Sequence, residues 1–522
     1  MEKFKTIILG IDGATWDILK NQAEKGNLPT FEKLMKDGAW GPLESCIPPV
    51  TAPAWVSIAT GKNPGKTGVF DFFNRVNENN LESKSVNSYK IKRTKPFWDI
   101  LSENNFKIGI WNYPFLYPPY EINGFMVSGL AASPNDEICY PKNLKNELLL
   151  IEKHYEIDVS HGSKKYIDNE ELFIKDISNL LTSNEKIIEY LIKNKDVNLF
   201  FGVISALDFM QHYLWKHIDK NHPSYKDDNP YKDEFLKLLK QIDNLLSKIL
   251  EILPDNTNIF LVSDHGFGPH ISNFYVNQFL LNSGYLKKIS KTKYFLNILL
   301  KSFDILRHLH SIIKLKQIPW DIKHFNTIDI KKSLAFNLNS IGIGGITINP
   351  ILIKNKNDFL KIREDIIKNL IKTTNSLKIK CEIFLPQEIY NGKYTNLAPD
   401  IMFKLDDFAV SVSQRFNKNI ISSSPSNHSG EHRMNGIFLA YGPDIKKGIN
   451  LNKAKLYDIA PTILHMFDIS IPDDIDGRVL KEIFKEESEY MKKNPKYSNY
   501  YKKNENDKLK NVIRNLKIKK KI

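Results

Sequence analysis

The chain has 522 residues, of which 42% are hydrophobic and 26% are charged. This length and composition are sufficient for a large buried core and exclude a wholly disordered or collagen-like chain. The formal net charge is +14, but residues 485–522 contain 13 basic and 5 acidic residues and hold +8 of it, so the tail rather than the body is strongly basic.

The first predicted element is a buried strand at Thr6–Ile11. Its residues are apolar or β-branched, and the run ends at Asp12, where the strand delivers a carboxylate to its C-terminal edge. Asp12 interrupts the apolar run and no small-residue cleavage site follows, which argues against a signal peptide. No stretch reaches the eighteen or so apolar residues of a membrane span, and the three cysteines are widely spaced. We therefore expect a cytoplasmic protein without a transmembrane segment.

The next informative segment is Pro49–Trp55, in which two prolines bracket Thr51 at the start of a predicted helix. The simplest role for a threonine at this position is that of an N-cap. Near a metal ion, the same hydroxyl would be a nucleophile, and a helix N-terminus favours bound phosphate. The following segment Asn74–Lys95 is rich in Asn, Lys and Ser, which predicts a surface loop.

Two further buried strands are predicted at Asn198–Ile204 and Asn258–Val262. Asp208 follows the first of them, and Asp264 and His265 follow the second. Ligands of open α/β sheets bind at the carboxyl edge of the strands, so these side chains are expected at one site. Because a buried carboxylate or imidazole needs a compensating partner, their gathering predicts a metal site.

Helical periodicity fills the segments between the strands, notably at Ser183–Lys195 and Asp233–Leu253. Strands that alternate with helices predict an α/β fold with a central mixed, mainly parallel sheet between helices. The Lys- and Leu-rich segment Tyr285–Phe325 interrupts this alternation, and its period predicts a helical insertion or lid. A basic amphipathic helix can touch a membrane, but packing on the main domain is the commoner arrangement.

Taken together, these motifs resemble the type I phosphodiesterase and nucleotide pyrophosphatase family of the alkaline phosphatase superfamily. The matching stretches occur in the order of the family and span Ile7 to about Leu480; they include ILGIDGATWDIL, PPVTAPAWVSIATGKNPGKTGVFDF, ALDFMQH, VSDHGFGP, APDIMFKL and SGEHRMNGIFLAYGPDIKKG. The resemblance implies an alkaline-phosphatase-like catalytic domain over residues 1–484, followed by a basic tail over 485–522 that is flexible or helical. It also implies hydrolysis of phosphoric ester or phosphoanhydride bonds.

The resemblance implies two divalent ions, usually zinc, with manganese or magnesium as alternatives. One ion would be held by Asp12, Asp264, His265 and the oxygen of Thr51, and the other by Asp208, His212 and His432. Thr51 would be the nucleophile that attacks phosphorus. His428 lies four residues before His432 and is a rival ligand, but His432 stands in the Gly-x-His context of the family.

Several alternatives remain open, because the scaffold fixes the metals while the lid and pocket choose the small-molecule ester. The nearest is a phosphomonoesterase or phosphotransferase of the same superfamily. A sulfatase is less favoured, since Cys46 stands in a Cys-x-Pro sequence that lacks the arginine of that branch. Least favoured is a non-catalytic protein that binds nucleic acid or an anionic surface through its basic tail. Ala54 and Trp55 replace the Asn-His that nucleotide-hydrolysing relatives typically carry.

Overall fold

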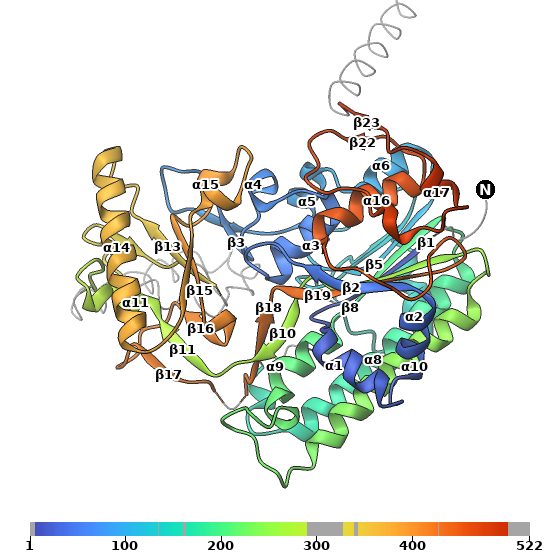
Figure 1. Cartoon of the computed structure of the whole chain (residues 1–522), viewed down its shortest axis with the longest axis horizontal. Coiled ribbons are helices and arrows are strands. Elements are labelled where there is room, and N and C mark those ends of the chain that lie inside the picture. The colour runs from blue at the N-terminus through green and yellow to red at the C-terminus, as the bar shows by residue number, and fades with distance from the viewer. Residues whose placement is uncertain are drawn as a thin grey trace, which may run out of the picture.

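The computed structural model describes residues 6–133, 135–159, 163–289, 327–338, 343–425 and 427–499. Its centre is a ten-stranded sheet with the order β20-β2-β19-β9-β1-β8-β5-β6-β7, in which β21 also pairs with β2 (Figure 1). The strands are β1 (Thr6–Ile11), β2 (Ala39–Glu44), β5 (Ile108–Tyr113), β6 (Gly124–Ser128), β7 (Cys139–Tyr140), β8 (Leu199–Ile204), β9 (Asn258–Val262), β19 (Asn435–Tyr441), β20 (Ile449–Asn450) and β21 (Ala454–Lys455).

The centre of this sheet is β1, which pairs in parallel with β8 on one side and β9 on the other. Ile11 lies opposite Ile204, and Gly10 lies opposite Val262, so the three strands end at the same edge. Antiparallel pairing is confined to β19 with its two neighbours and to β7 with β6. The predicted mixed, mainly parallel sheet is confirmed, as are the three buried strands.

Helices cover both faces of the sheet, as Figure 1 shows. Alternate residues of β1 point to opposite faces, so Ile7 and Leu9 join one core cluster and Ile8 joins the other. The first face is covered by α1 (Trp16–Glu24), α2 (Pro29–Asp37), α8 (Glu170–Asn194), α9 (Ala206–Ile218) and α10 (Tyr231–Ile252), and the second by α3 (Thr51–Thr60), α6 (Phe97–Glu103) and α16 (Ile459–Met466). The two predicted helices overlap α8 and α10, and each predicted range ends one residue beyond the helix.

A second, smaller sheet follows the third buried strand and has its own hydrophobic core. It is formed by β11 (Ser272–Tyr275), β12 (Ala335–Phe336), β13 (Gly344–Ile348), β14 (Cys381–Phe384), β15 (Ile401–Leu405), β16 (Val410–Ser413) and β17 (Ile421–Ser423), with α11 (Val276–Asn282) and α14 (Lys356–Ser376) beside it. A ribbon of β10 (Gly266–Pro269) and β18 (Gly430–Arg433) lies between the two sheets (Figure 1). The ribbon therefore starts directly after His265.

The prediction of a surface loop at Asn74–Lys95 is wrong. The segment contains strand β4 (Ser83–Ser85), which pairs with β3 (Phe73–Arg75), and helix α5 (Ser88–Thr94). The side chain of Asn87 accepts a hydrogen bond from the backbone N–H of Lys90 and so caps α5. The polar residues that predicted a loop thus begin a helix instead.

The remaining predictions on organisation concern residues at the edge of the described structure. The helical insertion lies outside the described residues from 290 onwards, and its first residues, 285–289, are not helical. In the basic tail, β23 (Tyr497–Ser498) pairs with β22 (Ile471–Pro472), so packing on the body continues past residue 484. The boundary at 484 stays a prediction. Among the helices that the structure describes, none has the length and apolarity to cross a membrane.

Gly10 permits the close packing of α3 on the centre of the sheet. A β-carbon at this position would stand 2.3 Å from Cη2 of Trp55, whose ring is held edge-on by Tyr113 and Phe201. We expect Gly10→Ala to lower the free energy of unfolding by about 1–3 kcal/mol, because a rigid aromatic ring must move. Urea unfolding measures this loss. In a Trp55→Phe background the loss should shrink, and an equal loss in both backgrounds would contradict the proposed clash.

Candidate active site

The first group of candidate ligands gathers where β1 and β9 end. Asp12 follows β1, and Asp264 and His265 follow β9, so the parallel register brings them together. The Nε2 atom of His265 lies 3.1 Å from Oδ2 of Asp264 and 3.6 Å from Oδ1 of Asp12. All three side chains are buried, and one ligand atom from each lies within 4.8 Å of the others.

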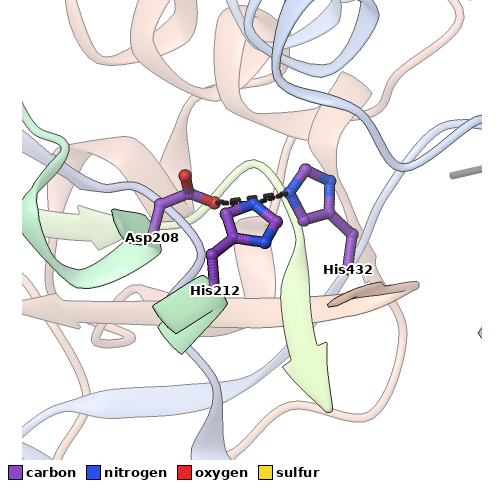
Figure 2. Close-up of side chains that lie close together, drawn as sticks. All are labelled: Asp208, His212 and His432. Carbon is purple, nitrogen blue, oxygen red and sulfur yellow. Dashed lines mark hydrogen bonds and ion pairs between the residues drawn. The ribbon is translucent and has the colours of Figure 1, made fainter. Parts of the chain in front are cut away.

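The second group is formed by Asp208 and His212 on α9 and by His432 on β18 (Figure 2). The two residues on α9 are four positions apart and therefore lie on one side of the helix. Oδ1 of Asp208 is 3.6 Å from Nε2 of His212 and 3.4 Å from Nε2 of His432. The two histidine Nε2 atoms are 3.1 Å apart. Three potential ligand atoms thus converge on one point.

The two groups adjoin each other. The rings of His265 and His432, one from each group, stack with their centroids 3.6 Å apart. The charge of Asp208 also acts on Asp12, since it contributes to raising the pKa of that carboxyl. The two triads are therefore adjacent halves of one buried site.

Several atoms of this site are buried and have no hydrogen-bond partner among the described residues. They are Oδ1 of Asp12, Oδ1 of Asp208, Oδ2 of Asp264 and Nε2 of His265. Such atoms are costly unless a cation binds them. Every orphaned atom is an oxygen or imidazole nitrogen of the kind that divalent transition metals accept. The residues present therefore fit the metal ions that the sequence predicts.

The pKa values of the first group, Asp12, Asp264 and His265, also indicate that its buried charges lack a partner. Burial, together with the charge of Asp208, raises the pKa of Asp12 to about 7. Burial and the charge of Asp12 raise the pKa of Asp264 well above its usual range. Burial and the charge of His432 lower the pKa of His265 to about 3, so its imidazole is neutral and able to bind a cation. A neutral imidazole beside crowded carboxylates is the state that a metal ion requires.

Backbone carbonyls orient all three histidines, a feature that the sequence analysis missed. The Nδ1 atoms of His212, His265 and His432 lie 3.0, 3.2 and 3.0 Å from the carbonyl oxygens of Gly430, Gly266 and Pro49, respectively. Each contact holds Nδ1 against the backbone and leaves Nε2 facing the centre of the site, which is the usual outer contact of a metal-binding histidine. The prolines and glycines of these motifs supply the carbonyls, but no spacing rule in the sequence reveals them.

Two residues that flank Thr51 in the sequence each contact one of the triads. Trp55, one helical turn later on α3, donates a hydrogen bond of 3.0 Å from its indole nitrogen to Oδ2 of Asp12. Pro49, two residues earlier, contacts His432. Val50 occupies the N-cap position, and Thr51 is the first helical residue. The interpretation of Thr51 as an N-cap is therefore wrong, and its buried hydroxyl is not used for capping.

The rival ligand His428 lies on the other side of His212. Its ring stacks on that of His212 with centroids 4.6 Å apart, and its Nε2 lies 3.4 Å from Oε2 of Glu431. Glu431 is buried; burial alone would raise its pKa, but the hydrogen bond from His428 and the nearby histidine charges bring the pKa well below its usual range. Asp208 thus gathers with His432 rather than with His428. The sequence analysis did not single out Glu431, although it directly precedes His432.

Comparison with known proteins shows which family and which solved structures the chain is similar to. A sequence model described as type I phosphodiesterase / nucleotide pyrophosphatase matches residues 6–434. No curated protein matches the chain. Human ectonucleotide pyrophosphatase / phosphodiesterase 5 aligns with a TM-score of 0.50 and 14% identity over 92% of this chain and 99% of that chain. An inactive variant of the murine counterpart, in complex with AMP, aligns with a TM-score of 0.50 and 13% identity over 92% and 100% of the two chains. At these identities the structural likeness concerns the fold.

Proposed function

Because this chain belongs to the type I phosphodiesterase / nucleotide pyrophosphatase family of the alkaline phosphatase superfamily, we propose that it cleaves small-molecule phosphodiesters with Thr51 as the nucleophile and two divalent ions as cofactors. Its alkaline-phosphatase-like fold and its family make it a hydrolase of phosphoester or pyrophosphate bonds. The observation that supports the finer proposal is a pair of adjacent buried triads, one in contact with Trp55 of α3 and the other with the carbonyl of Pro49 just before this helix.

Each proposed ion has its own set of ligands. Asp12, Asp264, His265 and the Thr51 oxygen would hold one ion, and Asp208, His212 and His432 would hold the other. Mixed carboxylate and imidazole donors favour zinc, with manganese as the second choice. When bound, the two ions supply positive charge that attracts phosphoryl oxygens and makes a nearby hydroxyl more acidic.

The residues of the chain carry out the remaining steps of the proposed reaction. Helix α3 carries the Thr51 hydroxyl in its first turn, where the positive end of the helix favours a phosphate. The Thr51 hydroxyl loses its proton as its oxygen attacks phosphorus, the bond to the leaving oxygen breaks, that oxygen takes up a proton, and a threonine phosphate ester forms. Water then attacks that phosphorus, releases phosphate ester product and returns the hydroxyl to Thr51. Trp55 keeps Asp12 oriented throughout.

A panel of substrates tests this proposal. Purified protein with bound zinc is expected to hydrolyse bis-p-nitrophenyl phosphate at least about tenfold faster, in kcat/KM, than p-nitrophenyl phosphate, and to leave p-nitrophenyl sulfate unchanged. A chelator should abolish the activity, and added zinc should restore it. A preference for the monoester would instead assign a phosphomonoesterase, and cleavage of the sulfate would assign a sulfatase. Activity that survives complete metal removal would contradict the proposed cofactors.

A further inference from the structure

A second polar pocket lies beyond the far end of α3. Its volume is about 400 Å³, which is in the range of small-molecule sites. It is lined by residues from α4 (Pro64–Thr67), from α5 and from the loop before the short helix η3 (Thr395–Leu397), together with Asp474. Helix α3 has ten residues, so about 15 Å of helix separates this pocket from Thr51. It is therefore distinct from the site described above.

Five cationic side chains line this pocket, which we call the distal cation pocket: Lys62, Lys66, Lys90, Arg93 and Lys393. Two of them are paired with carboxylates. Lys62, which is only 4% exposed, lies 2.7 Å from Oδ2 of Asp474, and Lys66 lies 2.5 Å from Oδ1 of Asp476. A buried lysine rarely occurs without such a partner. These two pairs build the floor of the pocket.

The other three cations, Lys90, Arg93 and Lys393, have no carboxylate partner within the described part of the chain. The ammonium groups of Lys90 and Lys393 lie 4.9 and 4.8 Å from the centroid of the same ring, that of Tyr394. Burial and the charges of Arg93 and Lys393 lower the pKa of Lys90. Like charges gathered around one ring create a positive potential there, which favours a bound anion.

Hydrogen bonds between separate segments of the chain hold the walls of the distal cation pocket. The backbone N–H of Tyr394 donates to the carbonyl of Gly65, and the side chain of Asn63 donates to that of Asn391. A β-carbon on Gly68, whose φ is +68°, would lie 3.0 Å from Nζ of Lys90. The glycine thus leaves the space into which Lys90 folds. Lys90 and Lys393 are thus placed beside Tyr394 before any ligand arrives, which lowers the entropic cost of binding.

From this arrangement we propose that the distal cation pocket binds the phosphate groups of a polyphosphorylated small molecule. An arginine supplies a planar fork of donors, and two lysines supply point charges, which is the combination that phosphate oxygens accept. Three unpaired positive charges match a ligand with several negative charges. A pocket of this volume admits a compact polyanion such as inorganic triphosphate.

Lysine footprinting with inorganic triphosphate tests the proposal on the metal-loaded protein. Acetylation by acetic anhydride, measured by mass spectrometry, should fall at least about fivefold at Lys90 and Lys393 when triphosphate is present. Lys361 and Lys368, which are exposed on α14, should react equally with and without it. Because this readout requires no turnover, it is independent of the proposed hydrolysis. Equal acetylation of Lys90 with and without triphosphate would overturn the proposal.

Matched triple variants test which charges bind. Replacing Lys90, Arg93 and Lys393 with alanine should weaken triphosphate binding at least about tenfold in calorimetry, because contacts with charged groups are lost. The control replaces Lys361, Lys368 and Lys372 of α14 with alanine and removes the same net charge from an exposed helix. It should bind triphosphate like the unmodified chain. Equal weakening of triphosphate binding in both variants would mean that net charge alone explains the effect, and it would overturn the proposal.

A kinetic comparison identifies the source of the phosphates. If they belong to the substrate, the Lys90, Arg93 and Lys393 variant should raise KM for a substrate that carries a polyphosphate tail and leave KM for bis-p-nitrophenyl phosphate unchanged. If they belong to a separate ligand, both KM values should stay unchanged while the loss of triphosphate binding persists. Both results support a phosphate-binding pocket and assign its occupant.

Discussion

Thr51→Ala is expected to lower kcat for bis-p-nitrophenyl phosphate by on the order of 10⁴-fold or more, because the proposed reaction cannot begin without the attacking oxygen. The substitution removes one hydroxyl and one methyl group at the first residue of α3 and leaves all three carboxylates and all three histidines of the two triads in place. Initial rates with the unmodified chain as reference measure the effect. Metal content measured on the same samples separates loss of the nucleophile from loss of an ion.

The matched control lies at the other end of the same helix. Thr60 is buried, and its hydroxyl donates a hydrogen bond of 2.7 Å to the carbonyl of Val56, far from both triads. Thr60→Ala should cost about 1 kcal/mol of unfolding free energy and keep kcat within about twofold. Thr51→Ser should retain measurable turnover, since it keeps a hydroxyl. If Thr51→Ala were as active as Thr60→Ala, Thr51 would not be the nucleophile.

The central sheet could be predicted from the sequence because its strands are buried on both faces. Thr6–Ile11 and Asn258–Val262 are continuous apolar runs, and their predicted bounds coincide with those of β1 and β9. Parallel register then brings the acidic residues that follow each strand to one edge. The gathering of Asp12, Asp208, Asp264 and His265 was thus within reach of sequence reasoning, since each comes shortly after a predicted strand, whereas the place of His432 followed only from the resemblance to the family.

What could not be predicted depends on contacts between distant segments. The strands of the smaller sheet are short, and they pair across many intervening residues: Ser272 of β11 lies opposite Val410 of β16. The carbonyl of Pro49 orients His432 from 383 positions away. No periodicity encodes such pairs. The polar segment at 74–95 was misinterpreted for a different, local reason, because the Asn87 cap and the burial of Ile91 make residues 88–94 a helix.

The distal cation pocket also could not be predicted from the sequence. Its cations come from segments around residues 62–66, 90–93 and 393, which the sequence shows only as separate lysines and arginines in polar surroundings. Charge composition directed attention to the tail, because the excess of lysine is greatest there. The fold instead gathers unpaired cations within the body, where each contributes little to a local charge count. A binding pocket of this kind is visible only once the chain has folded.

Asp264→Asn is expected to remove one bound metal ion and to lower kcat/KM by more than about 100-fold. Asparagine keeps the shape of the side chain and the hydrogen bond from the backbone N–H of Gly13, but it supplies no negative charge to an ion shared with Asp12 and His265. Metal analysis of the purified variant should find the other triad still loaded. Two ions per chain in Asp264→Asn would contradict the assignment of this carboxylate.

The same variant should change how the stability of the metal-free protein depends on pH. Folding raises the pKa of Asp12 to about 7 and that of Asp264 well above its usual range, so between pH 5 and 6 the unfolded chain has released both protons while the folded chain still holds them. As pH rises, each of these two carboxyls should lower the unfolding free energy of the chelated wild type by about 1.4 kcal/mol per pH unit, while His265, whose pKa falls to about 3 on folding, acts in the opposite direction because the unfolded chain binds that proton.

Chelated Asp264→Asn lacks one of these carboxyls, so its slope should differ from that of the chelated wild type by about 1.4 kcal/mol per pH unit, toward a smaller loss of stability as pH rises. Zinc should remove the contribution of both carboxyls to the slope in the wild type, because a bound cation replaces both protons as the partner of these carboxylates. Urea unfolding at pH 5.0, 5.5 and 6.0 measures all three slopes. Equal slopes for the two chelated proteins would mean that Asp264 is not the buried proton carrier, and a zinc-loaded slope as steep as the chelated one would place the ion elsewhere.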